Sequence, residues 1–138
     1  MPESNSAKKK LTRQQQKELD VTIDFLEGVL RRDPEYVDAL QLLGDGYTRR
    51  GKFKSGLEID ERLAQLRPDD ATVHYNLACS YSLVGKFEAA VAALDRALDL
   101  GYRDFKWLAK DSDLKALREH ALYKKIQEKL RRLKIEIG

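Results

Sequence analysis

The feature that most constrains the fold of this chain is a segment that repeats after thirty-four residues. A period of this length is typical of helical hairpins stacked into an array, because a single hairpin cannot bury its apolar face alone. The repeat therefore predicts paired helices rather than strands. Eight positions keep their residue: Pro34, Leu43, Tyr47, Gly51, Lys52, Phe53, Arg62 and Leu66 recur as Pro68, Leu77, Tyr81, Gly85, Lys86, Phe87, Arg96 and Leu100.

Small residues and turn residues within the unit indicate how its two helices meet. Gly44 in the first helix and Gly56 in the second leave room for a close crossing, as ridges-into-grooves packing requires. Gly51 ends the first helix, and Phe53 begins the second. Pro68 closes the unit, because proline is tolerated in a first helical turn and not inside a helix.

The repeated residues resemble the tetratricopeptide repeat (TPR) family. The first copy reads Leu-Gly and then Tyr47, the second reads Leu-Ala and then Tyr81, and both continue as Gly-Lys-Phe. The chain departs from the family pattern where Leu40 and His74 replace a frequent tryptophan and where Gly56 replaces alanine. The resemblance implies an all-α fold, a TPR-like solenoid of helical hairpins with about six to eight helices.

The pattern divides the chain into a tail and one repeat domain. Residues 1–10 lack periodicity, so we expect a disordered basic tail, which is either merely solvated or, through Lys8, Lys9 and Lys10, an arm for nucleic acid or an acidic partner. Residues 11–136 are expected to form a single TPR domain. It comprises a half repeat over 11–32, repeats over 35–68 and 69–102, and a degenerate repeat with a basic capping helix over 104–136.

The half repeat begins at Thr12, where Gln15 completes the pattern of a capping box. Its apolar residues recur at three- and four-residue steps, and a shift of thirty-four places Leu19 on Phe53. It is thus the second half of a unit that lacks its first half. Either this helix is an N-terminal cap with a charged outer side, or another chain fills the vacant position.

Helix boundaries follow from capping signals. Asp33, Pro34 and Glu35 predict an N-cap, a first helical residue and a first-turn acid for a helix that runs to about Arg49. Further helices are expected over 53–66, 71–83, 86–99 and about 120–135. The sequence Asp111-Ser112-Asp113 predicts a restart in the degenerate unit, and the last helix is expected to turn a basic face, which includes Lys129, away from the repeats.

The charge distribution and the single cysteine limit the compartments and partners that the sequence suggests. The net charge of +3 combines basic ends with acidic early repeats, since residues 18–70 carry thirteen acidic and eight basic groups. A single cysteine and an N-terminus without an apolar stretch indicate a cytoplasmic protein without a membrane span. A nucleic-acid or acidic-lipid surface on the basic last helix is a weaker reading, because no aromatic residue interleaves the basic run after Tyr123.

No catalytic motif stands out. His74 stands at the usual aromatic position of the repeat and is interpreted as a packing residue, and neither it nor His120 has a metal partner at ligand spacing. Cys79 has no cationic neighbour in sequence to activate its thiol. We therefore predict a noncatalytic protein that needs no cofactor and no metal.

Function in such an array usually comes from its concave surface, lined by the first helix of each pair. The predicted function is that of an adaptor whose groove binds a peptide or a helical segment of a partner protein. The alternative is a scaffold that forms homo-oligomers by repeat stacking at the open half repeat. The resemblance places these residues in the groove: Asp38, Gln41, Leu42, Asp45, Arg49, Thr72, Tyr75, Asn76, Cys79, Leu83, Lys106 and Lys110.

A subset of the family grips the C-terminal carboxylates of chaperones with lysine and asparagine side chains. By resemblance, Asn76, Lys106 and Lys110 match part of that set, whereas Gln41 and Asp45 stand where a lysine and an asparagine are needed. Asp45 would repel a carboxylate. The full set is therefore not expected, and Tyr75 and Asn76 are expected to serve binding rather than stability.

Overall fold

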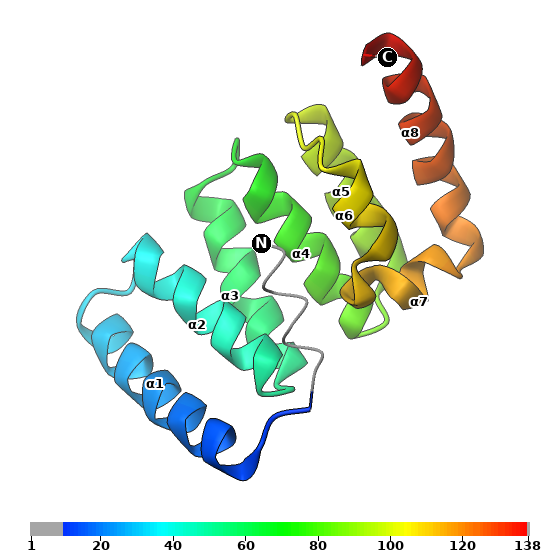
Figure 1. Ribbon diagram of the computed structural model, residues 1–138. Coiled ribbons are helices and arrows are strands. Elements are labelled where there is room, and N and C mark those ends of the chain that lie inside the picture. Colours follow the sequence, from blue (N-terminus) through cyan, green and yellow to red (C-terminus); the bar gives the residue numbers. More distant parts are fainter. Residues whose placement is uncertain (1–9, 138) are drawn as a thin grey trace.

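In the computed structural model, which describes residues 10–137, helices lie side by side in an array that runs from α1 at one end to α8 at the other (Figure 1). Within these residues there is no strand, so the all-α, TPR-like solenoid of helical hairpins is confirmed. Apart from Lys10, the predicted tail lies outside the described residues. The elements are α1 (Arg13–Arg32), α2 (Val37–Arg49), α3 (Phe53–Leu66), α4 (Ala71–Leu83), α5 (Phe87–Asp99), α6 (Phe105–Lys110), η2 (Ser112–Leu114), α7 (Lys115–Arg118), η3 (Ala121–Tyr123) and α8 (Lys124–Ile137).

Helices α2 and α3 cross at the small residues Gly44 and Gly56, as the sequence predicted. A Cβ atom added to Gly56 would lie 3.2 Å from Thr48 Oγ1 and 3.7 Å from the Gly44 carbonyl oxygen, so the two backbones approach closely. Gly51 and Gly85 end α2 and α4 with φ angles of 83° and 80°, in the left-handed region that side chains disfavour. Gly44 and Gly56 therefore allow the close crossing of α2 and α3, and Gly51 and Gly85 allow the turns that end α2 and α4.

Helix α1 packs on α2 as α3 packs on α4. The Tyr47 hydroxyl donates to Glu27 on α1, and the Tyr81 hydroxyl donates to Glu61 Oε2 on α3 at 3.0 Å. The second pair is the first pair shifted by thirty-four residues. The recurrence of one hydrogen bond indicates that α1 occupies the place of a second repeat helix.

Two apolar clusters hold the array together. One joins α1, α2, α3 and the start of α4 around Leu26, Leu40 and Leu63, and the other joins α4 and α5 to the C-terminal helices around Leu94, Leu98 and Leu114. Burying one such side chain stabilises the folded state by roughly 1.5–3 kcal/mol. The shared interior is continuous from hairpin to hairpin because Ala64 contacts both clusters.

The N-terminus of α2 differs from the prediction. Asp33 is the C-cap of α1 rather than the N-cap of α2, which begins at Val37 after Tyr36. Tyr36 makes no side-chain capping bond, whereas Asp70, thirty-four residues later, accepts from Thr72 N at 2.9 Å. The prediction was wrong because the capping position lies two residues after the proline in both copies, and only the second copy has an acceptor there.

Replacing Tyr36 by aspartate should therefore supply the missing cap. Tyr36 is exposed, so its loss removes little packing, and an N-cap acceptor contributes about 1 kcal/mol to stability. We expect the Tyr36→Asp variant to gain about that amount in urea unfolding followed by circular dichroism. Asp70→Ala is the matched control and should lose a similar amount. A lower stability for Tyr36→Asp would mean that Tyr36 has a packing role.

The degenerate third unit closes the C-terminal end. Asp111 follows α6, and its Oδ1 accepts from Asp113 N at 3.0 Å, so a new helical segment begins where the restart was predicted. The last α-helix begins at Lys124, after η3, and not at residue 120. Lys129 was assigned to the basic face directed away from the repeats, but its Nζ lies 2.7 Å from Asp95 Oδ1 and also contacts Asp99 on α5.

Candidate functional site

A groove of about 370 Å³ lies between α2 and α4, with α3 at its floor and the turn after α6 at its end. The turns that fix the helix ends also place the first helices of two hairpins beside each other, so their side chains face one another across the groove. Its lining consists of Gln41, Leu42, Gly44, Asp45, Thr48, Asp60, Leu63, Thr72, Val73, Asn76, Cys79, Ser80, Leu83, Asp111 and Asp113.

Seven of the residues expected in the groove lie in this lining, and four others do not. Asp38, Arg49, Lys106 and Lys110 are exposed but contribute nothing to the lining. The groove therefore contains Asn76 without the two lysines that carboxylate capture would need. The residues in the lining are Gln41, Leu42, Asp45, Thr72, Asn76, Cys79 and Leu83.

Tyr75 was expected in the groove and is instead buried, with 1% of its surface exposed. Its ring stacks on Tyr102 with centroids 4.1 Å apart, and its hydroxyl donates to Asp111 Oδ2 at 2.7 Å. The expectation failed because α6 has only six residues, and the chain after it folds back over α4. Gln41, the equivalent residue of the first repeat, has no such cover and is exposed.

Two side chains in the lining are available to a ligand. Leu42 has 61% of its surface exposed, a large fraction for a leucine inside a groove. The amide of Asn76 has no hydrogen-bonding partner among residues 10–137. Together they offer an apolar contact and a group that both donates and accepts hydrogen bonds, as recognition of an extended backbone requires.

The charged residues of the lining are all acidic. Asp45, Asp60, Asp111 and Asp113 contribute carboxylates, and no lysine, arginine or histidine of the described part of the chain belongs to the lining. Burial, which outweighs the Ser80 hydrogen bond, and the charge of Asp45 raise the pKa of Asp60 to about 6. The groove floor therefore has a negative character that composition alone did not reveal.

Asp60 was missed at the sequence level, although the repeat contains a signal for it. Shifts of thirty-four residues in either direction place Asp60 on Leu26 and Leu94, both buried core leucines. Asp60 is itself 8% exposed, and its Oδ2 accepts from the Ser80 hydroxyl. A carboxylate at a position that packs leucine in the other units is unfavourable for stability, so comparing the copies would have singled it out.

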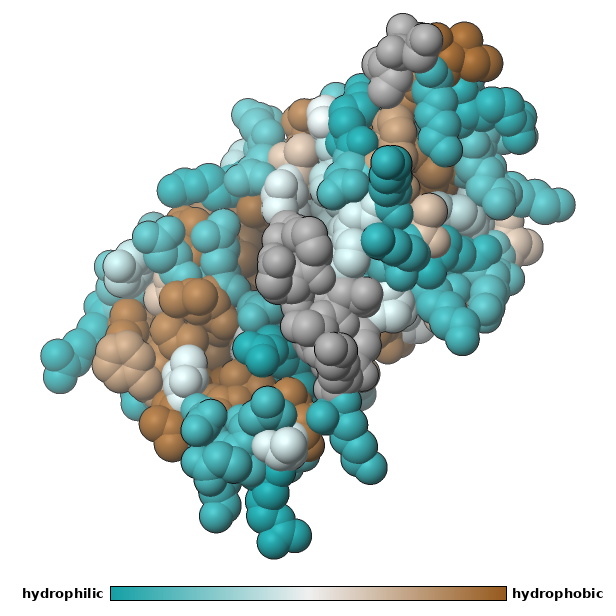
Figure 2. All heavy atoms as spheres, viewed as in Figure 1, coloured by the Kyte–Doolittle hydropathy of each residue, from teal (hydrophilic) through white to brown (hydrophobic). Residues whose placement is uncertain are grey.

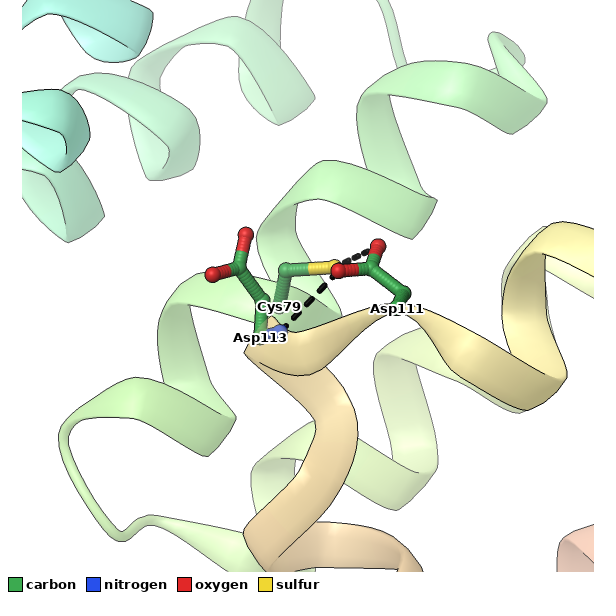
Figure 3. Close-up of side chains that lie close together, drawn as sticks. All are labelled: Cys79, Asp111 and Asp113. Carbon is green, nitrogen blue, oxygen red and sulfur yellow. Dashed lines mark hydrogen bonds between the residues drawn. The ribbon is translucent and has the colours of Figure 1, made fainter. Parts of the chain in front are cut away.

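A second polar cluster, Cys79, Asp111 and Asp113, lies at the end of the groove (Figure 3). One ligand atom from each residue lies within 4.8 Å of the others, so the set is close enough to hold an ion. Asp111 already accepts from Tyr75, from Cys79 Sγ at 3.7 Å and from Asp113 N. Burial raises the pKa of the Cys79 thiol well above its usual range, which keeps it protonated and unreactive.

Both histidines have structural partners. His74 Nε2 lies 2.8 Å from the Pro68 carbonyl oxygen, and His120 Nδ1 accepts from Leu122 N at 3.1 Å. The His120 ring also lies 4.7 Å from that of Phe87. The two imidazoles therefore contribute to turns and packing, on separate elements.

Apolar side chains also gather on the surface over the α1–α2 end of the molecule (Figure 2). Val21 and Phe25, one turn apart on α1, have 69% and 68% of their surfaces exposed. The outer side of α1, expected to be charged, therefore also presents a hydrophobic pair.

Comparison with known proteins finds similarity to repeat-containing segments of much longer chains. The chain is 38% identical over 76 residues to a chloroplastic protein of Arabidopsis thaliana, covering 53% of this chain and 23% of that protein. It is 32% identical over 87 residues to the peroxisomal targeting signal receptor of Komagataella phaffii, covering 63% of this chain and 15% of the receptor. It is 34% identical over 76 residues to superkiller protein 3 of Schizosaccharomyces pombe, covering 55% of this chain and 6% of that protein. No protein-family model matches.

The chain spans less than a quarter of the length of each of these relatives. Among residues 10–137, no helix has the length and apolarity that crossing a bilayer demands. The comparisons support a protein-interaction role in a TPR-like helical repeat.

Proposed function

We propose that this chain is a noncatalytic adaptor of the TPR family, a single repeat domain whose groove binds an extended or helical segment of a partner protein in the cytoplasm. The observation that carries the proposal is the groove between α2 and α4, in which Leu42 is exposed and the Asn76 amide has no partner among the described residues. A peptide segment supplies both the apolar side chain and the backbone groups that these two residues lack. The similarity to a protein named as a receptor for a peroxisomal targeting signal supports the same proposal.

Replacing Leu42 and Asn76 tests this proposal. Both side chains lie at the groove surface, so Leu42→Ala and Asn76→Ala should change the free energy of unfolding by less than about 1 kcal/mol. A photo-cross-linking amino acid at Thr72, an exposed residue of the same lining, is expected to capture a partner, and both substitutions should lower the yield about tenfold. Leu122→Ala is the control, since Leu122 is an exposed leucine outside the groove. Equal yields in all variants would contradict binding in the groove.

The second candidate function is self-association through α1. Val21 and Phe25 form an exposed apolar pair on α1, which favours a second copy at this end of the array. Basic C-terminal and acidic early segments would then attract each other.

Light scattering measures this self-association directly. The average mass should rise with protein concentration and fall in high salt, where charge attraction is screened. Phe25→Glu should keep the chain monomeric, while Leu122→Glu should not. A monomeric mass for the unsubstituted chain at high concentration in both low and high salt would contradict the idea.

A further inference from the structure

The charge of the groove identifies the chemistry of the segment that fits it. We propose that the groove takes an extended segment of a partner protein whose arginine or lysine side chain lies over the floor between Asp45 and Asp60, with apolar residues next to it. This inference rests on the proposed function and adds the class of partner. Its first support is charge complementarity, since the residues between 10 and 137 that line the groove include four aspartates and no cationic side chain.

The aspartates act on one another electrostatically. The charge of Asp45 helps to raise the pKa of Asp60, and the charges of Asp111 and Asp60 help to raise that of Cys79. Like charges close together in a partly desolvated groove are unfavourable, and a guanidinium or ammonium group placed among them reverses the sign of the interaction. An anionic segment would add to the repulsion, which is why the groove selects for a cation.

Packing in the core does not explain why position 60 carries a charged residue. Leu26 and Leu94 fill the equivalent positions of the other units and are buried at 5% and 0% exposure. A Cβ at Gly44 would lie 3.2 Å from Asp60 Oδ1, so the α2 backbone packs closely against this carboxylate and a glycine at position 44 leaves room for it. A costly residue at a core position beside an open groove is the pattern expected at a binding site.

The rest of the lining specifies the neighbours of the cation. Leu42 is exposed at one wall, and Val73 and Leu83 lie along the other, so apolar side chains next to the cation would be buried on binding. Gln41 and Asn76 provide amides for the backbone of the segment. The groove therefore fits an extended stretch in which one basic residue is flanked by apolar ones.

Selection of short random peptides displayed on phage, with the full chain as bait, tests the proposal. We expect the recovered sequences to share an arginine or lysine at one position with apolar neighbours. A synthetic peptide of the consensus, with both ends blocked, is then titrated by fluorescence anisotropy. Replacing its basic residue by glutamine should weaken binding about tenfold, and raising the salt concentration should weaken binding of the arginine peptide but hardly that of the glutamine peptide.

Substitutions in the protein locate the cation. Asp45→Asn and Asp60→Asn should each weaken binding of the arginine peptide about fivefold or more and leave the glutamine peptide unaffected. Asp38→Asn is the matched control, because Asp38 is an exposed aspartate on α2 outside the lining. Circular dichroism of each variant verifies that it is folded.

The possible failures are distinguishable. Recovery of acidic or uncharged peptides, or equal affinities for the arginine and glutamine peptides, overturns this inference and leaves binding in the groove intact. Recovery of no peptide, together with no cross-linked partner at Thr72, overturns the proposed function itself. If replacing Lys8, Lys9 and Lys10 by glutamine tightens binding about tenfold, the occupant is the chain's own N-terminal segment, and a partner is not needed.

Discussion

Replacing Tyr75 by alanine is expected to lower the free energy of unfolding by about 4 kcal/mol, because a fully buried aromatic side chain leaves a cavity that the surrounding helices fill only in part. The change also removes the ring stacked on Tyr102 and the hydroxyl that donates to Asp111. Urea unfolding followed by far-ultraviolet circular dichroism measures this loss.

Two control variants separate the contributions at this position. Tyr75→Phe keeps the ring and should cost about 1–3 kcal/mol, the penalty for leaving the buried Asp111 carboxylate one donor short. Gln41→Ala changes the equivalent residue of the first repeat, which is exposed, and should stay within about 0.5 kcal/mol of the unsubstituted chain. Near-equal stability of Tyr75→Ala and Gln41→Ala would contradict the burial of Tyr75 and return it to the groove surface.

The contrast between Tyr75 and Gln41 shows what a repeat pattern predicts and what it does not. Helix boundaries such as Phe53–Leu66 follow from local signals, namely a glycine turn before the helix and an apolar stripe within it. Asn76 and Leu83 lie in the groove lining, where the repeat register places them. Burial of Tyr75 depends instead on how the degenerate third unit folds back over α4, a tertiary contact that no periodicity encodes.

Other differences have equally specific causes. The start of α2 was predicted too early because Asp33 and Pro34 resemble an N-cap and a first helical residue. In the structure the N-cap of α2 is Tyr36. Lys129 was assigned to the outer face because the pattern of α8 does not reveal that Asp95 and Asp99 lie opposite it. The first error concerns the capping position within the turn before α2, and the second concerns a contact with the neighbouring helix α5.

The acidic floor could have been found by comparing the copies rather than by searching for motifs. A helical stripe tolerates one polar residue, so Asp60 does not disturb the periodicity of α3 and does not stand out in a search for motifs. Only alignment of Asp60 with Leu26 and Leu94 shows that a core position carries a charge. An exception within a repeat is therefore the better indicator of a binding site in this chain.

The stability of the protein should fall between pH 4 and pH 6 on account of Asp60. The unfolded-state pKa of an aspartate is 3.8, and in the folded chain burial and the charge of Asp45 raise that of Asp60 to about 6 despite the Ser80 hydrogen bond. In this interval the folded state binds more protons than the unfolded state, so the free energy of unfolding decreases as pH rises. A rise of about two pKa units corresponds to a loss on the order of 3 kcal/mol once the pH exceeds 6.

Asp60→Asn removes this penalty and is expected to be more stable than the unsubstituted chain at pH 7 by up to about 3 kcal/mol, while near pH 4 the two should be similar. Urea unfolding at intervals from pH 4 to pH 7.5 gives the difference, and Asp38→Asn shows the effect of removing an exposed charge from α2. A constant difference across the range would mean that Asp60 has no raised pKa in the folded chain. Because the same substitution should weaken the arginine peptide, a variant that is more stable and binds less well would show that the carboxylate is retained for binding at the expense of stability.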